Sequence, residues 1–183
     1  MHNIKKLTDQ QINDNKREII KLLSSTHRDG IESVINYLTN SNFFYTRSSY
    51  NRHHNWLGGL AEHSLGVYHI AKDLAQSIPD ESIIIAAILH DICKSTMRYK
   101  NEYGKTVYKY ADIYGHGRRS IKLLTKVCNL KLTEEERRAI RWHMGGHHAK
   151  HHEKDDVKTA RQSELWKIVH QADHCDAKNN PPC

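Results

Sequence analysis

Six histidine and aspartate side chains lie beside or inside apolar stretches of the chain, where a buried metal site would find its ligands. They are His63, His90, Asp91, His116, His143 and Asp173. Burying an ionised carboxylate among imidazoles is costly unless a charged group pairs with it, and a bound cation is the most economical partner. Imidazole and carboxylate ligands without thiolates suit Mn, Fe, Co, Ni, Zn or Mg. Because six ligands exceed the needs of one catalytic ion, we expect two divalent ions bridged by Asp91.

The His90-Asp91 pair follows an uninterrupted apolar run at residues 83–89. Such a run predicts a helix that is buried on all sides. Neighbouring residues on a helix diverge by about 100°, so both side chains can reach one ion only near the end of the helix. Residues 93–95 would supply that end. Taken alone, the pair is also typical of a core histidine beside a capping aspartate.

Each remaining candidate falls on a predicted helix, with apolar residues three or four positions away. These helices span residues 59–77 with His63, 113–127 with His116, 133–143 with His143 and 163–177 with Asp173. A lone inward histidine is usually a satisfied core residue. Several such helices, together with the His90-Asp91 pair, favour the interpretation of these side chains as metal ligands. The fifteen histidines of the chain also make metal binding worth testing.

The rest of the chain predicts a single all-α domain with one small exception. Two amphipathic helices, over residues 8–24 and 31–38, and a polar loop would form an N-terminal extension, residues 1–50, ahead of a core at 51–178 and a flexible tail at 179–183. Alternation of residues at 97–110 predicts a small β-hairpin. Its tyrosines interleave with lysines and an arginine, so it would either stack a base and hold phosphates or be an ordinary solvated hairpin.

Four further histidines crowd a polar stretch of the chain. They are His147, His148, His151 and His152. Their density resembles a second metal site, but the charged residues around them favour a solvated surface. The sequence does not assign their role.

Composition narrows the class of partner. The net charge of +7 and a pI near 9.2 point to an anionic partner such as a phosphate ester or nucleic acid, although plain solubility would explain them too. The four cysteines form no CxxC pair, which argues against a zinc ribbon and a disulfide framework. No apolar run is long enough to cross a bilayer and the first residues lack the pattern of a signal peptide, so we expect a cytoplasmic protein without a membrane partner. Nothing indicates the oligomeric state.

The order and context of the candidates resemble the HD-domain superfamily of metal-dependent phosphohydrolases. The resemblance covers about residues 51–178 and depends on His63 in GGLAEHSLGV, His90-Asp91 in AAILHDICK and Asp173 in VHQADHCDAK. His116 in YGHGRRS and His143 in IRWHMGG match the added histidines of the two-metal branch. The stretch RHHNWLGGLAEH is similar to the HD domains of certain bacterial 3'-5' exoribonucleases and to relaxase-associated HD domains. Family members often have glycine at the position of Cys93.

The resemblance implies an HD-domain bundle of about six to eight helices and a hydrolytic mechanism. By analogy, one ion would bind His63, His90, Asp91 and Asp173, and the other would bind Asp91, His116 and His143. Asp91 and Lys94 would be the catalytic residues, with Lys94 neutralising phosphate charge. Further substrate contacts are expected at Arg118, Arg119 and His54, for which surface solvation is an equal alternative.

Other functions fit the same residues. The first expectation is a phosphohydrolase or phosphodiesterase acting on a phosphate-containing small molecule or short nucleic acid. A di-iron oxygenase is the alternative that a few superfamily members suggest. A catalytically silent module that binds nucleotide or nucleic acid is the third, and a helical bundle with scattered core histidines is the fourth. The substrate and the metal are not encoded in the ligand types.

Overall fold

The computed structural model describes residues 7–49, 52–96 and 115–179. Over these residues the chain forms eight α-helices and no strand, which confirms the all-α prediction. The α-helices are α1 (Asp9–Ser24), α2 (Ile31–Asn40), α3 (Gly59–Leu74), α4 (Asp80–Leu89), α5 (His116–Lys122), α6 (Glu134–Trp142), α7 (Lys154–Gln162) and α8 (Glu164–Asn179). The hairpin predicted at 97–110 and the tail from residue 180 onward fall outside the described residues.

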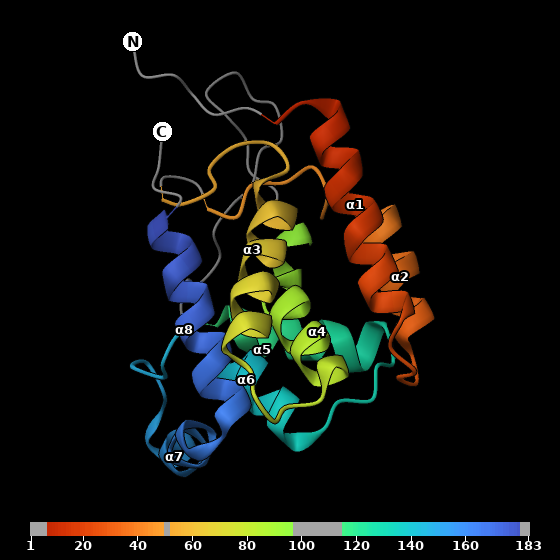
Figure 1. Cartoon of the computed structure of the whole chain (residues 1–183). Coiled ribbons are helices and arrows are strands. Elements are labelled where there is room, and N and C mark those ends of the chain that lie inside the picture. Colours follow the sequence, from red (N-terminus) through yellow and green to blue (C-terminus); the bar gives the residue numbers. More distant parts are fainter. Residues whose placement is uncertain (1–6, 50–51, 97–114, 180–183) are drawn as a thin grey trace, which may run out of the picture.

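The centre of the bundle is α3 beside α4, with α8 against α3 (Figure 1). Every residue from Ile83 to Leu89 is buried, as expected for a helix without a polar face. The helix ends at Leu89, and a 3-10 helix, Ile92–Thr96, follows almost at once. The His90-Asp91 pair therefore lies at the helix end that the sequence predicted.

The N-terminal helices α1 and α2 cover one side of the centre, and α1 packs on both α3 and α4 (Figure 1). Helix α1 begins with a capping box, in which Thr8 and Gln11 satisfy each other's backbone N–H groups. Its buried residues, Ile12, Ile19 and Leu23, form the inward stripe of an amphipathic helix. These two helices stabilise the scaffold and carry none of the predicted ligands.

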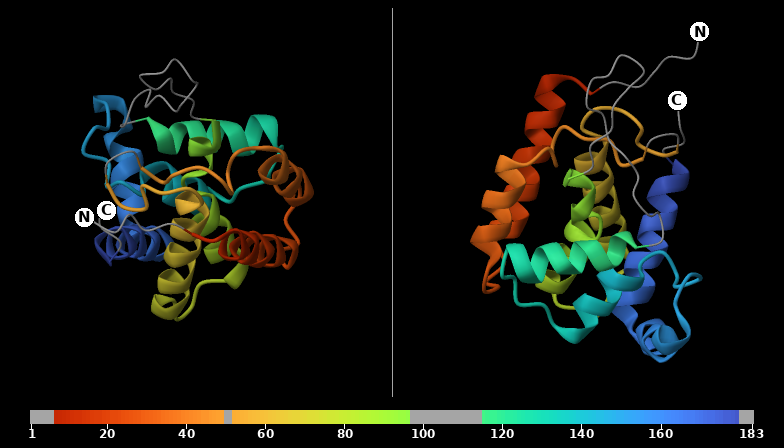
Figure 2. Two further views of the ribbon diagram at one scale, coloured as in Figure 1. Left: turned by 90° about the horizontal axis from the view of Figure 1, so that it is seen from above. Right: turned by 180° about the vertical axis from the view of Figure 1, so that it is seen from behind.

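Helices α5 and α6 cross behind the centre, and α7 lies at the lower end of the bundle next to α6 and α8 (Figures 1 and 2). The close approach of α5 to α6 depends on Gly117, because a Cβ there would lie 2.4 Å from the carbonyl oxygen of Arg141. This contact brings the start of α5, with His116, to the end of α6, with His143.

The predicted boundaries need three corrections. Helix α3 ends at Leu74, before the predicted residue 77, because Ala75 takes an extended conformation. The helix that begins at His116 continues into a π-helical turn, Leu123–Val127. The polar stretch before residue 163 was not expected to be helical, yet it contains a 3-10 helix, His151–Glu153, and all of α7. Within the described residues no helix is long and apolar enough to span a membrane.

Candidate metal centre

Five helices bring all six predicted ligands to one place. Each side chain is buried, from fully enclosed His63 and His90 to Asp173 with 9% of its surface exposed. Two groups of three have ligand atoms within 4.8 Å of one another. One is His63, His90 and Asp173, and the other is His90, Asp91 and His143. We call the six residues together the buried cluster.

Asp91 lies between the two halves of the buried cluster. Its Oδ2 is 3.4 Å from Nε2 of His90. Its Oδ1 is 3.4 Å from Nε2 of His116 and 3.7 Å from Nε2 of His143. Because the two oxygens face different imidazoles, this carboxylate is oriented as a bridge between two neighbouring cation positions.

Asp173 completes the half that contains His63. Its Oδ1 is 3.2 Å from Nε2 of His63 and 3.9 Å from Nε2 of His90. Donor atoms at 2.0–2.2 Å from a shared ion lie roughly 3.0–3.5 Å apart, so most of these separations already match a coordination sphere. Within the described residues, Nε2 of His63, Nε2 of His90 and Oδ1 of Asp91 form no hydrogen bond although they are buried. Buried ligand atoms of this type without a hydrogen-bond partner fit a metal site.

The opposite ring nitrogens are held by the protein. Nδ1 of His90 donates to the carbonyl oxygen of Ala87 at 2.7 Å, and Nδ1 of His143 donates to that of Ile140 at 2.8 Å. Both histidines cap the C-terminal ends of their helices, where carbonyl groups lack intrahelical partners. A proton fixed on Nδ1 leaves the Nε2 lone pair free for a metal.

Asp176 does the same for His63, and the sequence analysis missed it. Nδ1 of His63 donates to Oδ2 of Asp176 at 2.6 Å, and the carboxylate is buried. Space for it comes from Gly66 on α3, where a Cβ would lie 2.0 Å from Oδ1 of Asp176. The signal was present, since Asp173 and Asp176 are three apart and share one face of a helix.

The charges of the cluster are mutually stabilising. Burial raises the pKa of Asp91, but Lys94 and His90 outweigh it and hold that pKa well below its usual range. Burial also opposes ionisation of Asp173, but the neighbouring imidazoles, first of all His63 at 3.2 Å, outweigh it and lower the pKa of this carboxyl. Burial, with His116 and His90, lowers the pKa of His143 to about 3. The carboxylates are thus ionised and His143 is neutral, as ligands must be.

His63 differs because two carboxylates flank it. Burial lowers its pKa, but Asp173 and Asp176 together raise it to about 9. Without a metal, His63 is therefore protonated at neutral pH. A cation coordinated by its Nε2 would replace that proton.

Lys94 and Cys93 support the geometry next to Asp91. The buried ammonium of Lys94 forms an ion pair with Oδ2 of Asp91. The thiol of Cys93 contacts the carbonyl oxygen of His116 at 3.3 Å, and its backbone N–H is 3.4 Å from Oγ of Ser120. Cys93 therefore packs onto α5 next to His116.

The predicted substrate contacts lie at different depths. Arg118 is more than half exposed and pairs with Glu153, and Arg119 is partly buried. His54 is buried behind His63, with Nδ1 3.6 Å from Oδ2 of Asp176 and a left-handed backbone, φ 49°. Their contacts with substrate stay a prediction.

Two other groups of histidines differ in whether their ring nitrogens converge. His53, which the sequence analysis did not single out, joins His54 and His63 as a third group of converging ring nitrogens. The surface histidines, by contrast, belong to none of the convergent groups found among the described residues. These are His147, His148, His151 and His152, and all four are exposed.

A cavity of about 270 Å³ opens beside the buried cluster. His116 and His143 form part of its wall, so one half of the cluster is reached from this side. Arg52 and Arg141 line the same wall, and the charge of Arg141 is paired with Glu153 at 2.8 Å. The guanidinium of Arg141 lies 3.9 Å above the ring of Trp142. The cavity therefore borders the half of the buried cluster that His116 and His143 form.

Comparison with known proteins gives a family and no individual relative. No curated protein and no solved structure matches the chain. The family model described as "HD domain" matches residues 60–178, which include the whole buried cluster and Asp176. Together with the all-helical fold, this match shows that the chain belongs to the HD-domain superfamily of metal-dependent phosphohydrolases.

Proposed function

We propose that the chain hydrolyses a phosphoester of a nucleotide or short nucleic acid as a metal-dependent phosphohydrolase or phosphodiesterase. The observation that carries this proposal is the bridging orientation of Asp91 among imidazole Nε2 atoms. His63, His90, Asp91 and Asp173 would hold one ion, and Asp91, His116 and His143 would hold the second. Bound divalent ions lower the pKa of a coordinated water and polarise a phosphoryl oxygen.

Lys94 would act on the substrate together with Asp91. Its ammonium is buried and lies against Oδ2 of Asp91, so a phosphoryl oxygen arriving at this carboxylate also meets a positive charge. Electrostatic stabilisation is strong where water is excluded. Lys94 is thus positioned to stabilise negative charge on the phosphoryl oxygens as the ester bond breaks.

The cavity beside His116 and His143 would orient the ester. Arg52 and Arg141 line it, and a basic wall favours an anionic group over a neutral one. The net charge of +7 acts in the same direction over a longer range. Arg118 and Arg119 lie at the start of α5, so they would contact parts of the substrate away from the reacting phosphorus.

The test compares two histidines of α3. The protein is stripped with a chelator, reloaded separately with Mn, Fe, Co, Ni, Zn or Mg, and assayed on an aryl phosphate monoester, an aryl phosphate diester, nucleotides and oligonucleotides. We expect turnover with at least one metal and its loss in His63→Ala. His69→Ala is the matched control, because His69 faces solvent and pairs with Glu18. Metal-loaded protein that turns over none of these esters would contradict the proposal.

The same preparation distinguishes the other functions. Oxygen consumption that requires iron and fails with zinc would identify the di-iron oxygenase. Phosphate-ligand binding that survives His90→Ala and Asp91→Ala, without turnover, would identify a silent binding module. The absence of bound metal in elemental analysis would revive the bundle with structural core histidines.

A further inference from the structure

A second cavity lies on the far side of the segment that borders the first. The two cavities share Gly146, His147 and Ala149 as lining residues, so these residues form a ridge between them. The second cavity, of about 480 Å³, lies between this ridge and α7. We call it the α7 groove.

One wall of the α7 groove is a basic face of helix α7. Lys154, Lys158 and Arg161 line it and are spaced by four and three residues, which puts them on the same side of α7. Like charges at this spacing destabilise a helix. Within the described residues, neither lysine forms an ion pair. The acidic Asp156 is directed away from them, toward Arg137 and Arg138 of α6.

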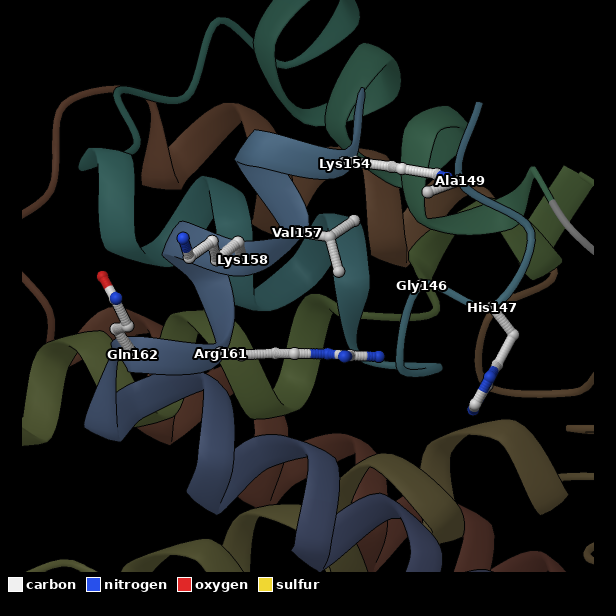
Figure 3. A pocket seen from close by; sticks show the side chains of 8 residues that line it. All are labelled: Gly146, His147, Ala149, Lys154, Val157, Lys158, Arg161 and Gln162. Carbon is white, nitrogen blue, oxygen red and sulfur yellow. The ribbon is translucent and has the colours of Figure 1, made fainter. Parts of the chain in front are cut away.

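Two of the cations reach across the groove. Figure 3 shows the side chains of Lys154 and Arg161 extending from α7 toward the ridge, with Val157 between them. One guanidinium nitrogen of Arg161 donates to the carbonyl oxygen of Gly145 at 2.8 Å, which fixes the charge in place. A pair of positive groups around an apolar floor suits an anion that is attached to a less polar group.

The ridge and the wall of the first cavity next to it carry groups that suit a base. Met144, 52% exposed, and the exposed imidazoles of His147 and His148 line the first cavity. Imidazole rings stack on bases, and methionine adapts its shape to flat apolar surfaces. Along the surface, the first cavity beside the buried cluster is thus followed by stacking groups and then by a second cationic cavity.

From this alternation we propose that the α7 groove binds a backbone phosphate of a short single-stranded nucleic acid whose neighbouring phosphodiester enters the buried cluster. The proposal extends the proposed function, since it selects an oligonucleotide over a mononucleotide as substrate. Mononucleotides have no second backbone phosphate to span the ridge. Stacking groups between cationic sites are the usual means of binding single strands without sequence preference.

The test measures strand binding and small-ester hydrolysis separately. Fluorescence anisotropy with short, uncleavable phosphorothioate oligonucleotides, one RNA and one DNA, is recorded as a function of salt for Lys154→Gln and Arg161→Gln. Each variant should weaken binding roughly fivefold to tenfold at low salt and reduce the salt slope by about 0.7, because one phosphate contact is lost. Hydrolysis of an aryl phosphate diester should stay unchanged, because that ester does not extend beyond the ridge.

Two controls isolate the charge. Arg161→Lys retains the positive charge and should bind strands nearly as the parent does, although it loses the guanidinium contact with Gly145. Lys167→Gln removes an exposed lysine of α8 outside the groove and should have no effect. If Lys167→Gln weakens binding as much as the groove variants, the effect comes from the overall charge and the proposal fails. If Arg161→Lys weakens it as much as Arg161→Gln, the positive charge of the groove does not hold the strand and the proposal fails as well.

The possible results test strand binding in the groove and ester hydrolysis at the buried cluster separately. Unchanged strand affinity in both glutamine variants, or no strand binding by the parent, overturns the groove even when aryl esters are hydrolysed. Groove-dependent strand binding without turnover of any ester supports the groove and contradicts the hydrolase. Preference of the groove for RNA or DNA would show which strand it accepts.

Discussion

Two histidine-rich regions of this protein behave in opposite ways. The buried cluster takes its four histidines from four helices spread over residues 63–143, whereas the four surface histidines lie within residues 147–152. Only the first group converges, because buried imidazoles are oriented by hydrogen bonds from Nδ1. The local density of histidine in a sequence is therefore a weaker sign of a metal site than inward orientation on separate helices.

The largest expected effect concerns His90, which belongs to both convergent groups. His90→Ala should weaken binding of the ion that His63, His90, Asp91 and Asp173 would hold by more than about 100-fold, because it removes a ligand where the replacement of a supporting residue alone costs 10–100-fold. Elemental analysis after gel filtration measures the metal content.

The matched variant replaces all four surface histidines by alanine and should retain the parent's metal content. Equal metal loss in the two variants would erase the distinction between the regions. Circular dichroism of both proteins excludes unfolding as the cause.

A smaller effect is expected for Asp176, which supports the cluster through His63. Asp176→Asn keeps the size of the side chain but removes the negative charge that accepts the Nδ1 proton at 2.6 Å. Metal affinity should fall by about 10–100-fold, as it does when a partner of a ligating histidine is replaced. Isothermal titration with Mn measures the affinity, and Asp155→Asn on the exposed side of α7 is the control. Unchanged affinity would mean that the orientation of His63 does not depend on Asp176.

Gly66 tests the same contact from the opposite side. A Cβ at this position would lie 2.0 Å from Oδ1 of Asp176, so Gly66→Ala should push the carboxylate away from His63. We expect a loss of metal affinity of less than about tenfold, because the side chain can shift partway. In the Asp176→Asn background the same substitution should cost less. Additive effects would show that the glycine acts elsewhere.

The sequence was sufficient to predict which candidate ligands are buried, but not to predict the residues that support them. His63, the His90-Asp91 pair and Asp173 could be identified because each follows an apolar pattern that forces it inward. The end of α4 could also be placed, since two adjacent residues cannot share an ion inside a regular helix. The hairpin prediction at 97–110 falls outside the described residues and stays a prediction.

Asp176 and α7 were missed for physical reasons. Asp176 lies among charged and polar neighbours, and its burial depends on the missing side chain of Gly66, a contact between distant segments. Helix α7 has only Val157 and Ala160 as buried residues, so its apolar stripe is too narrow to identify from periodicity. Its position depends instead on polar contacts with α6.

The smallest effect concerns the polar contacts between α7 and α6, the helix that ends at His143. Asp156 of α7 accepts hydrogen bonds from Trp142 at 2.8 Å, Arg138 at 2.8 Å and Arg137 at 3.0 Å. Burial raises the pKa of Asp156, but these three partners outweigh it and lower the pKa to about 2. In the unfolded chain the pKa is about 3.9.

The sign follows from the depressed pKa in the folded state. The stabilisation by Asp156 is complete above about pH 4 and is lost as the pH falls through about 2. It amounts to about 1–2 kcal/mol, since the carboxylate is partly solvated. The protection factors of the α7 amides, corrected for the intrinsic pH dependence of exchange, should therefore fall on acidification in the parent, while those of Asp156→Asn should be low already at neutral pH and change less with acid. If α7 of the variant stays as protected as that of the parent at neutral pH, apolar packing by Val157 and Ala160 alone holds α7 in place.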